Sequence, residues 1–258
     1  MANHRKRWDA KLKGLTYANS EVWQPATEGR VFVMRRMLAL VLLAVCLFAV
    51  PVHAASQIIS ARADLGTVVV SYESTAKVKV EVSKDGTSYY YDLTGTEAFP
   101  LQMGNGTYRV SVLENVQGNR YKVVRRENIL VETTSANAPY LSSVQNVNWN
   151  AEDAAIVKAE ELSESKDQLA AIYSYLVSNV KYDYNKIQTL TPGYLPNIED
   201  TFTSNRGICY DFAALFASML RSQGVPAKLV MGYTPNAVGY HAWNEVYVDG
   251  KWVVIDIT

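Results

Sequence analysis

One stretch near the end of the chain, residues 207–258, constrains the fold more than any other. After Cys209, apolar side chains recur at three- and four-residue spacing, which predicts a helix with one buried face that ends at Gly224. The side chains of that face are Phe212, Leu215, Phe216, Met219 and Leu220. Gly207 precedes the helix, so Cys209 is expected in or just before its first turn. Free backbone N–H groups and the positive end of the helix dipole favour a thiolate there, which predicts a reactive cysteine.

A predicted β-hairpin brings a histidine and an aspartate together. Residues 241–248 and 252–257 have the composition of strands, and the Asp-Gly pair at 249–250 is typical of a tight hairpin turn. Reflection about the centre of this turn puts His241 opposite about position 258, close to Asp256. A carboxylate beside an imidazole holds the ring in one orientation and stabilises its charged form. The pattern therefore predicts a nucleophile, a base and an orienting acid.

Four blocks of this stretch resemble the transglutaminase-like superfamily. The blocks are 207–211 (GICYD), 224–227 (GVPA), 241–246 (HAWNEV) and 252–256 (WVVID). The similar region spans residues 169–258, about a third of the chain. The resemblance implies a papain-like fold, in which a cysteine-bearing helix packs against an antiparallel sheet. It also implies that Cys209, His241 and Asp256 form a catalytic triad.

Each of these residues also has a structural interpretation. A single cysteine is most often a buried structural thiol, and a single histidine is more often a surface or core residue than a base. Asp256 lies in an otherwise apolar strand, and an inward carboxylate costs several kcal/mol unless it is paired, so we expect it to point inward against His241. Asp211 and Glu245 are interpreted as a first-turn helix acid and an outward strand residue. They are left out of the triad.

The residues and the resemblance together predict a cysteine-dependent acyl-transfer enzyme that acts on amide bonds through a thioester. Amine transfer would make it a transglutaminase, whereas hydrolysis would make it a peptidase or amidase. The expected substrate is a protein or peptide amide, with cell-wall peptide among the alternatives, and no cofactor is expected. A second hypothesis is a non-catalytic secreted binding module that uses the same fold as a scaffold.

The beginning of the chain predicts export. Residues 34–54 combine a basic start, an apolar run over 37–50 and small residues before Ala55, which together are typical of a signal peptide. The apolar run is shorter than the roughly 20 residues of a membrane-spanning helix. We therefore expect a secreted or cell-surface protein that touches the membrane only if this segment stays uncleaved. Residues 1–33 are interpreted as a non-native or disordered leader.

Cleavage after residue 54 would change the composition in ways that exclude several functions. It removes eight basic and three acidic residues, which leaves 17 basic against 22 acidic. Without clustered positive charge, nucleic-acid binding is not expected. Cys209 and His241 would become the sole cysteine and the sole histidine. This excludes an intramolecular disulfide and argues against a Cys/His metal site, because zinc takes three or four protein ligands.

The rest of the chain predicts a second, all-β region in front of the helical one. Residues 55–134 contain five segments rich in Val, Tyr and Thr, separated by Gly- and Asn-containing turns, which favours a small immunoglobulin-like sandwich. The expected strands are 67–72, 77–82, 88–93, 107–113 and 122–131. Residues 135–150 are interpreted as a linker, and 151–258 as the catalytic domain. The fold class expected for the whole is thus α+β.

Within residues 151–258, two helices are expected before the cysteine, over 151–162 and 166–180. Ser165 and Gln168 are interpreted as a capping box for the second of these helices. Tyr182 follows it and is interpreted either as an aromatic residue near the cysteine, as the resemblance implies, or as a core residue. Residues 190–200 are expected to form a loop that covers the cleft.

Overall fold

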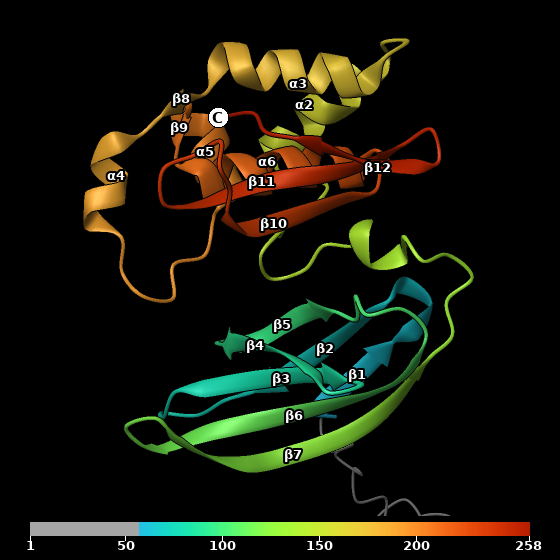
Figure 1. Ribbon diagram of the computed structural model, residues 1–258, viewed down its shortest axis with the longest axis vertical. Helices are drawn as coiled ribbons and strands as arrows, with labels where there is room; N and C mark the ends of the chain where they lie inside the picture. Colours follow the sequence, from blue (N-terminus) through green and yellow to red (C-terminus); the bar gives the residue numbers. More distant parts are fainter. Residues whose placement is uncertain (1–56) are drawn as a thin grey trace, which may run out of the picture. The chain divides into compact units, whose positions relative to one another are not determined.

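The computed structural model describes residues 57–258 (Figure 1). The leader predicted for residues 1–33 and the signal peptide predicted for 34–54 lie outside these residues. Within the described part of the chain, no helix has the length and apolar character needed to cross a membrane. The export prediction therefore stays a prediction.

The first half of the described chain forms two antiparallel sheets. One has the strand order β1-β2-β5, with β1 at Ile59–Arg62, β2 at Thr67–Tyr72 and β5 at Gly95–Pro100. The other has the order β4-β3-β6-β7, with β3 at Val78–Lys84, β4 at Thr87–Leu93, β6 at Gly106–Gln117 and β7 at Arg120–Val131. Both sheets contribute to a single cluster of buried residues, in which Val70 and Phe99 from one sheet join Val80, Val110 and Ile129 from the other. The α+β class is confirmed, and the immunoglobulin-like type of this region stays a prediction.

All five strands predicted here are present, with ends that differ by at most four residues. Alternation explains why they were recognisable: in β3, Val78, Val80 and Val82 are buried while the residues between them are not. Strands β1 and β5 were not predicted. The sequence of β5, GTEAFP, begins with glycine and ends with proline, two residues that favour turns over strands.

Residues 135–150 connect this region to the helical part and make specific contacts with both. They include a short 3₁₀ helix, η2, at Ala138–Tyr140. Gln145 donates its backbone N–H to Ala98 O in β5 (2.9 Å), and Ser142 O accepts a hydrogen bond from Arg221 Nη1 (2.7 Å). The predicted domain boundaries on either side of this segment stay predictions.

The second half contains five helices around one three-stranded sheet. The helices are α2 at Ala154–Ser163, α3 at Gln168–Asn179, α4 at Tyr184–Thr189, α5 at Ile198–Ser204 and α6 at Cys209–Ser222. The sheet has the antiparallel order β10-β11-β12, with β10 at Ala227–Tyr233, β11 at Tyr240–Val248 and β12 at Lys251–Ile255. A two-stranded parallel pair joins β8 (Lys181–Tyr182) to β9 (Arg206–Gly207). Helix α6 is buried along most of its length, because it packs on the sheet as well as on α2, α3 and α5 (Figure 1).

Two local predictions in this half need correction. The cap of α3 is Asp167, not Ser165: the Asp167 carboxylate accepts the N–H of Ala170 (3.0 Å), as an aspartate at this position commonly does. The loop predicted for residues 190–200 ends earlier than expected. Asn197 caps α5 by accepting the N–H groups of Glu199 and Asp200, so the helix has already begun at residue 198.

Candidate active site

Cys209 is the first residue of α6, as predicted from the apolar spacing. Ile208 occupies the capping position before it, and its N–H is satisfied by Asp211 Oδ2 (2.9 Å) from the first turn of the helix. This return contact fixes the backbone on both sides of the cysteine. The thiol is partly buried and is the free cysteine of the described residues.

Gly207 is required because the chain passes close to Asp211. A Cβ atom at this position would lie 2.7 Å from Asp211 Cβ and 3.1 Å from Thr201 Cγ2. No side chain larger than hydrogen fits at that distance unless the helix start moves. The glycine two residues before the cysteine thus allows β9 and the first turn of α6 to pack together.

Asp211 is the centre of a buried polar cluster that the sequence did not reveal. Its side chain is fully buried, and it accepts hydrogen bonds from Lys186 Nζ (2.6 Å) and from the hydroxyl of Tyr194 as well as from Ile208. Burial lowers the pKa of Lys186, but the hydrogen bonds to Asp211 and Tyr194 outweigh it and raise the pKa overall. Burial and the bond to Asp211 raise the pKa of Tyr194 to about 12. The cluster ties α4 and the loop after it to the start of the cysteine helix.

His241 and Asp256 are in contact, as the hairpin turn predicted. Strands β11 and β12 pair Asn244 with Ile255 and Val248 with Lys251, which places the turn centre between residues 249 and 250. The His241 Nε2 atom lies 2.8 Å from Asp256 Oδ2. Because Asp256 engages Nε2, Nδ1 is the ring nitrogen left for another partner.

Asp256 is held from both sides but does not point inward. Its Oδ1 accepts the N–H (3.2 Å) and the hydroxyl (2.8 Å) of Thr258. Burial alone would raise the pKa of Asp256, but the hydrogen bonds from His241 and Thr258 hold this pKa below its ordinary value. Its side chain is 37% exposed, so the predicted inward orientation is wrong. The reason is that β12 ends at Ile255, one residue before it.

The cysteine and the histidine are linked through a small buried cluster rather than through a direct bond. Ile208, Tyr210 and Ala213 of the cysteine segment form this cluster with Ala242, the neighbour of His241, and Cys209 packs against it. Among residues 57–258, no hydrogen bond joins the Cys209 thiol to the His241 ring. The catalytic roles assigned to the three residues stay predictions.

Asn244 fixes how the cysteine helix sits on the sheet. It is fully buried, and its side-chain amide donates to Ala213 O in α6 (2.9 Å) and to Lys228 O in β10 (3.0 Å). One side chain thereby joins the helix to two strands. An asparagine between the inward residues Ala242 and Val246 was the signal that could have identified it.

Tyr182 lies beside the cysteine, in agreement with one of its two interpretations. It is paired with Gly207 across β8 and β9, and its ring stacks on Phe212 with centroids 6.4 Å apart. Burial raises the pKa of Tyr182, and the Cys209 thiol raises it further, whereas the Cys209 N–H lowers it. Tyr182 and Cys209 also pack against the same small buried cluster.

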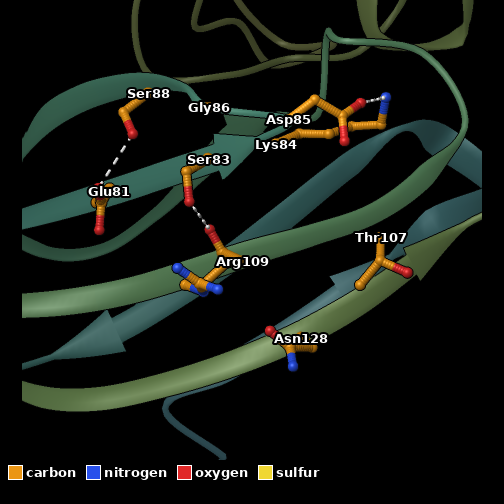
Figure 2. A pocket seen from close by; sticks show the side chains of 9 residues that line it. All are labelled: Glu81, Ser83, Lys84, Asp85, Gly86, Ser88, Thr107, Arg109 and Asn128. Carbon is orange, nitrogen blue, oxygen red and sulfur yellow. Dashed lines mark hydrogen bonds and ion pairs between the residues drawn. The ribbon is translucent and has the colours of Figure 1, made fainter.

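Two hollows of the described surface lie outside these residues. The first, termed the edge groove, has a volume of about 590 Å³, and its lining includes Tyr89, Tyr140, Arg221, Leu229, Met231 and Tyr240. The second is a polar hollow of about 340 Å³ on β3, β4 and β6, where Ser88 donates to Glu81 and Ser83 donates to Arg109 O (Figure 2). Neither is lined by Cys209, His241 or Asp256. Within residues 57–258, no cluster of three or more His, Cys, Asp or Glu side chains is arranged to hold a metal ion.

Comparison with known proteins bears on the same segment. Residues 154–257 match the family model described as the transglutaminase-like superfamily. The mouse kyphoscoliosis peptidase is 28% identical over 111 residues, which cover 38% of this chain and 16% of that protein. A UPF0252 protein of Methanocaldococcus jannaschii is 26% identical over 183 residues, which cover 64% of this chain and 49% of that protein.

Among solved structures, the periplasmic domain of TgpA from Pseudomonas aeruginosa is 18% identical, with a TM-score of 0.37, over 74% of this chain and 70% of that one. The family match covers the cysteine helix and both strands of the His-Asp hairpin. Residues 154–257 of this chain therefore contain a domain of the transglutaminase-like superfamily.

Proposed function

We propose that this chain is a cysteine-dependent acyl-transfer enzyme that acts on amide bonds of proteins or peptides. The observation that carries the proposal is the His241–Asp256 pair at 2.8 Å, in the domain where Cys209 begins a buried helix. A hydrogen-bonded imidazole and carboxylate in the same domain as a helix-start cysteine is the combination that thiol acyl transfer needs.

In the first step, the Cys209 thiolate attacks the carbonyl carbon of the amide. The negative charge moves to the carbonyl oxygen, and His241, in its charged form, gives its proton to the departing nitrogen. The carbon–nitrogen bond breaks, the amine or ammonia leaves, and a thioester remains on Cys209. Asp256 holds the His241 ring by Nε2 and stabilises its charged form.

In the second step, water or a primary amine attacks the thioester carbon and gives a proton to His241. The carbon–sulfur bond breaks and the Cys209 thiolate is restored. Attack by water gives hydrolysis, whereas attack by an amine gives a new amide and therefore a cross-link. Cysteine peptidases and transglutaminases share every residue role up to this point, so the competition between nucleophiles decides the outcome.

Tyr182 supplies the second donor for the negative oxygen in this proposal. The backbone N–H of Cys209 is the first donor, and Tyr182 packs with Cys209 against the same small buried cluster. Two donors that converge on the position where charge develops stabilise the transition state more than the substrate. Export from the cytoplasm, by the signal peptide predicted for residues 34–54, completes the proposal.

The proposal is tested with purified protein, a lysine-methylated casein as glutamine donor and a fluorescent primary amine. We expect fluorescence in the casein band, release of ammonia, or new casein fragments by mass spectrometry, each of them abolished by prior treatment with iodoacetamide. Turnover that survives complete alkylation of Cys209 would contradict the cysteine mechanism.

The rate of alkylation separates the enzyme from a binding module that only uses the fold. A thiolate paired with His241 should react with iodoacetamide quickly and at nearly constant rate between about pH 6 and 8. Slow alkylation that rises tenfold per pH unit would support the scaffold hypothesis instead.

Replacing Tyr182 with phenylalanine is expected to lower kcat by about 10- to 100-fold with little change in KM, because the lost hydrogen bond forms in the transition state. Tyr173→Phe is the matched control: Tyr173 is an exposed tyrosine of α3 and should retain wild-type kinetics. Equal kcat for the two variants, with unchanged folding by circular dichroism, would remove Tyr182 from the mechanism.

A further inference from the structure

The edge groove runs along β10, the outer strand of the sheet that carries His241. Its lining includes the four consecutive β10 residues 228–231. Successive side chains of a strand point to opposite faces, so four in a row can line one groove only if the edge of the strand faces it. Tyr240, the residue before His241, also lines the groove. The groove therefore reaches β11 one residue before His241.

The outer edge of β10 carries backbone groups suited to pairing with another strand. Tyr247 of β11 donates its N–H to Pro226 O (2.9 Å), so the even-numbered residues of β10 bond to β11. The odd-numbered residues then direct their N–H and C=O groups outward. Ala227 O accepts Arg221 Nε (2.9 Å) at that edge, which leaves Leu229, Met231 and Tyr233, and the first two of these line the groove. An edge of this kind binds extended peptides in other proteins.

A buried positive charge lies at the other end of the groove. Arg221 is only 6% exposed and donates to two carbonyl oxygens, Ala227 O and Ser142 O. No carboxylate of residues 57–258 lies within 4.0 Å of it, whereas the neighbouring Lys228 is paired with Glu245 at 2.8 Å. Burial lowers the pKa of Arg221 to about 9, which still leaves it charged at neutral pH. An uncompensated guanidinium in a groove favours an anion, and its planar fork matches a carboxylate.

A second buried polar atom in the groove lacks a partner. Asn146 lines the same groove, and its buried Oδ1 atom accepts no hydrogen bond. A buried acceptor without a donor is uncommon in folded proteins.

Two lengths place this charge at similar distances from Cys209 and from His241. Arg221 follows Cys209 by twelve residues of one helix, or about 18 Å at 1.5 Å per residue. Strand β10 returns from Ala227, which Arg221 contacts, to Gly232, which pairs with His241; this is about 17 Å at 3.3 Å per residue. An extended peptide covers either length with about five residues.

We propose that the edge groove binds an extended peptide segment of the substrate, which pairs with β10 at Leu229 and Met231 and places a carboxylate on Arg221. The carboxylate would lie about five residues from the amide that reacts at Cys209. This inference rests on the proposed function and names its substrate class: peptides with an acidic group at that spacing. A C-terminal carboxylate and an acidic side chain offer the same two oxygens.

The test measures binding, so it does not depend on turnover. Full-length Cys209→Ala protein is titrated with acetylated peptides that carry one glutamine followed by two, five or eight Gly and Leu residues, ending in a free carboxylate or an amide. With five residues after the glutamine, we expect the peptide that ends in a carboxylate to bind about tenfold more tightly than the peptide that ends in an amide. With two residues, the difference should be less than about threefold. An amide-ended peptide with aspartate at the fifth position shows whether a side chain serves equally.

A second variant separates the charge from the rest of the groove. Adding Arg221→Gln should remove the preference for the acid and leave amide binding within about twofold, whereas Arg109→Gln in the exposed polar hollow should keep the preference (Figure 2). If Arg221→Gln does not fold, the strand pairing is tested instead with five-residue peptides that are methylated on backbone nitrogens. Methyl groups on alternate residues should abolish binding, and those on the intervening residues should be tolerated.

Equal affinity of acid and amide at every spacing, or no binding of any peptide at millimolar concentration, would overturn the inference. So would equal tolerance of methylation at all positions. Absence of turnover in the wild-type protein, with the acid preference intact, would instead refute the proposed function and leave the peptide site standing.

Discussion

Replacing Cys209 with alanine is expected to abolish amide turnover, with kcat lower by on the order of 10⁴-fold or more, because no other atom of the site can form the thioester. The measurement is ammonia release and amine incorporation in parallel, with labelled casein and fluorescent amine. Cys209→Ser keeps the size and a potential nucleophile but loses the easily formed thiolate. Its kcat should therefore also be lower by at least about 10³-fold.

The outcome that contradicts this expectation is residual turnover within tenfold of wild type in a variant that folds. Folding is checked by the melting temperature, which should change little because Cys209 is the first residue of α6 and is only partly buried. Loss of activity together with a large fall in melting temperature would show a structural thiol.

The orienting acid has a matched control on the same hairpin. Asp256→Asn removes the charge beside His241 and should lower kcat by about 100-fold, because small misplacements of a catalytic group have effects of that size. Asp249→Asn makes the same change in the exposed turn, where φ is +50° and asparagine is favoured. Similar kinetics for the two variants would mean that Asp256 does not orient the histidine.

The elements of the site that could be predicted from sequence are those with local causes. The register of β11 and β12 follows from the Asp249-Gly250 turn, whose φ angles of +50° and +79° fit a tight hairpin. The helix at Cys209 follows from a strong apolar spacing over fourteen residues. Neither depends on distant parts of the chain.

The elements that were missed depend on contacts between distant residues or on short helices. Helices α4 and α5 have six and seven residues, too short to be stable without packing, although Asp183 and Asn197 cap them and could have revealed them. The Asp211 cluster joins Lys186 and Tyr194 from 25 and 17 positions earlier in the chain. No sequence spacing predicts such a meeting. The exposed position of Asp256 was missed because the strand ends two residues sooner than its apolar pattern suggested.

The largest effect on stability is expected at Asp211. Its carboxylate is fully buried and satisfies a lysine, a tyrosine and the N–H of Ile208. Asp211→Ala removes all three acceptor contacts at once and leaves the Lys186 ammonium near the interior without a counter-charge. A buried pair broken from one side typically costs about 3–5 kcal/mol, and we expect the free energy of unfolding to fall by that amount. Urea titration measures it.

The comparison that identifies the cause is a double-mutant cycle with Lys186→Met. If the cost of Asp211→Ala arises from the stranded ammonium, the double variant should be more stable than Asp211→Ala alone, because both charges are gone. Asp167→Ala, which removes only the cap of α3, should cost about 1 kcal/mol and sets the scale for an ordinary capping loss. Strictly additive effects at 186 and 211 would show that the lysine and the aspartate do not depend on one another. In that case the ion pair between Lys186 and Asp211 would not anchor α4 to the cysteine helix.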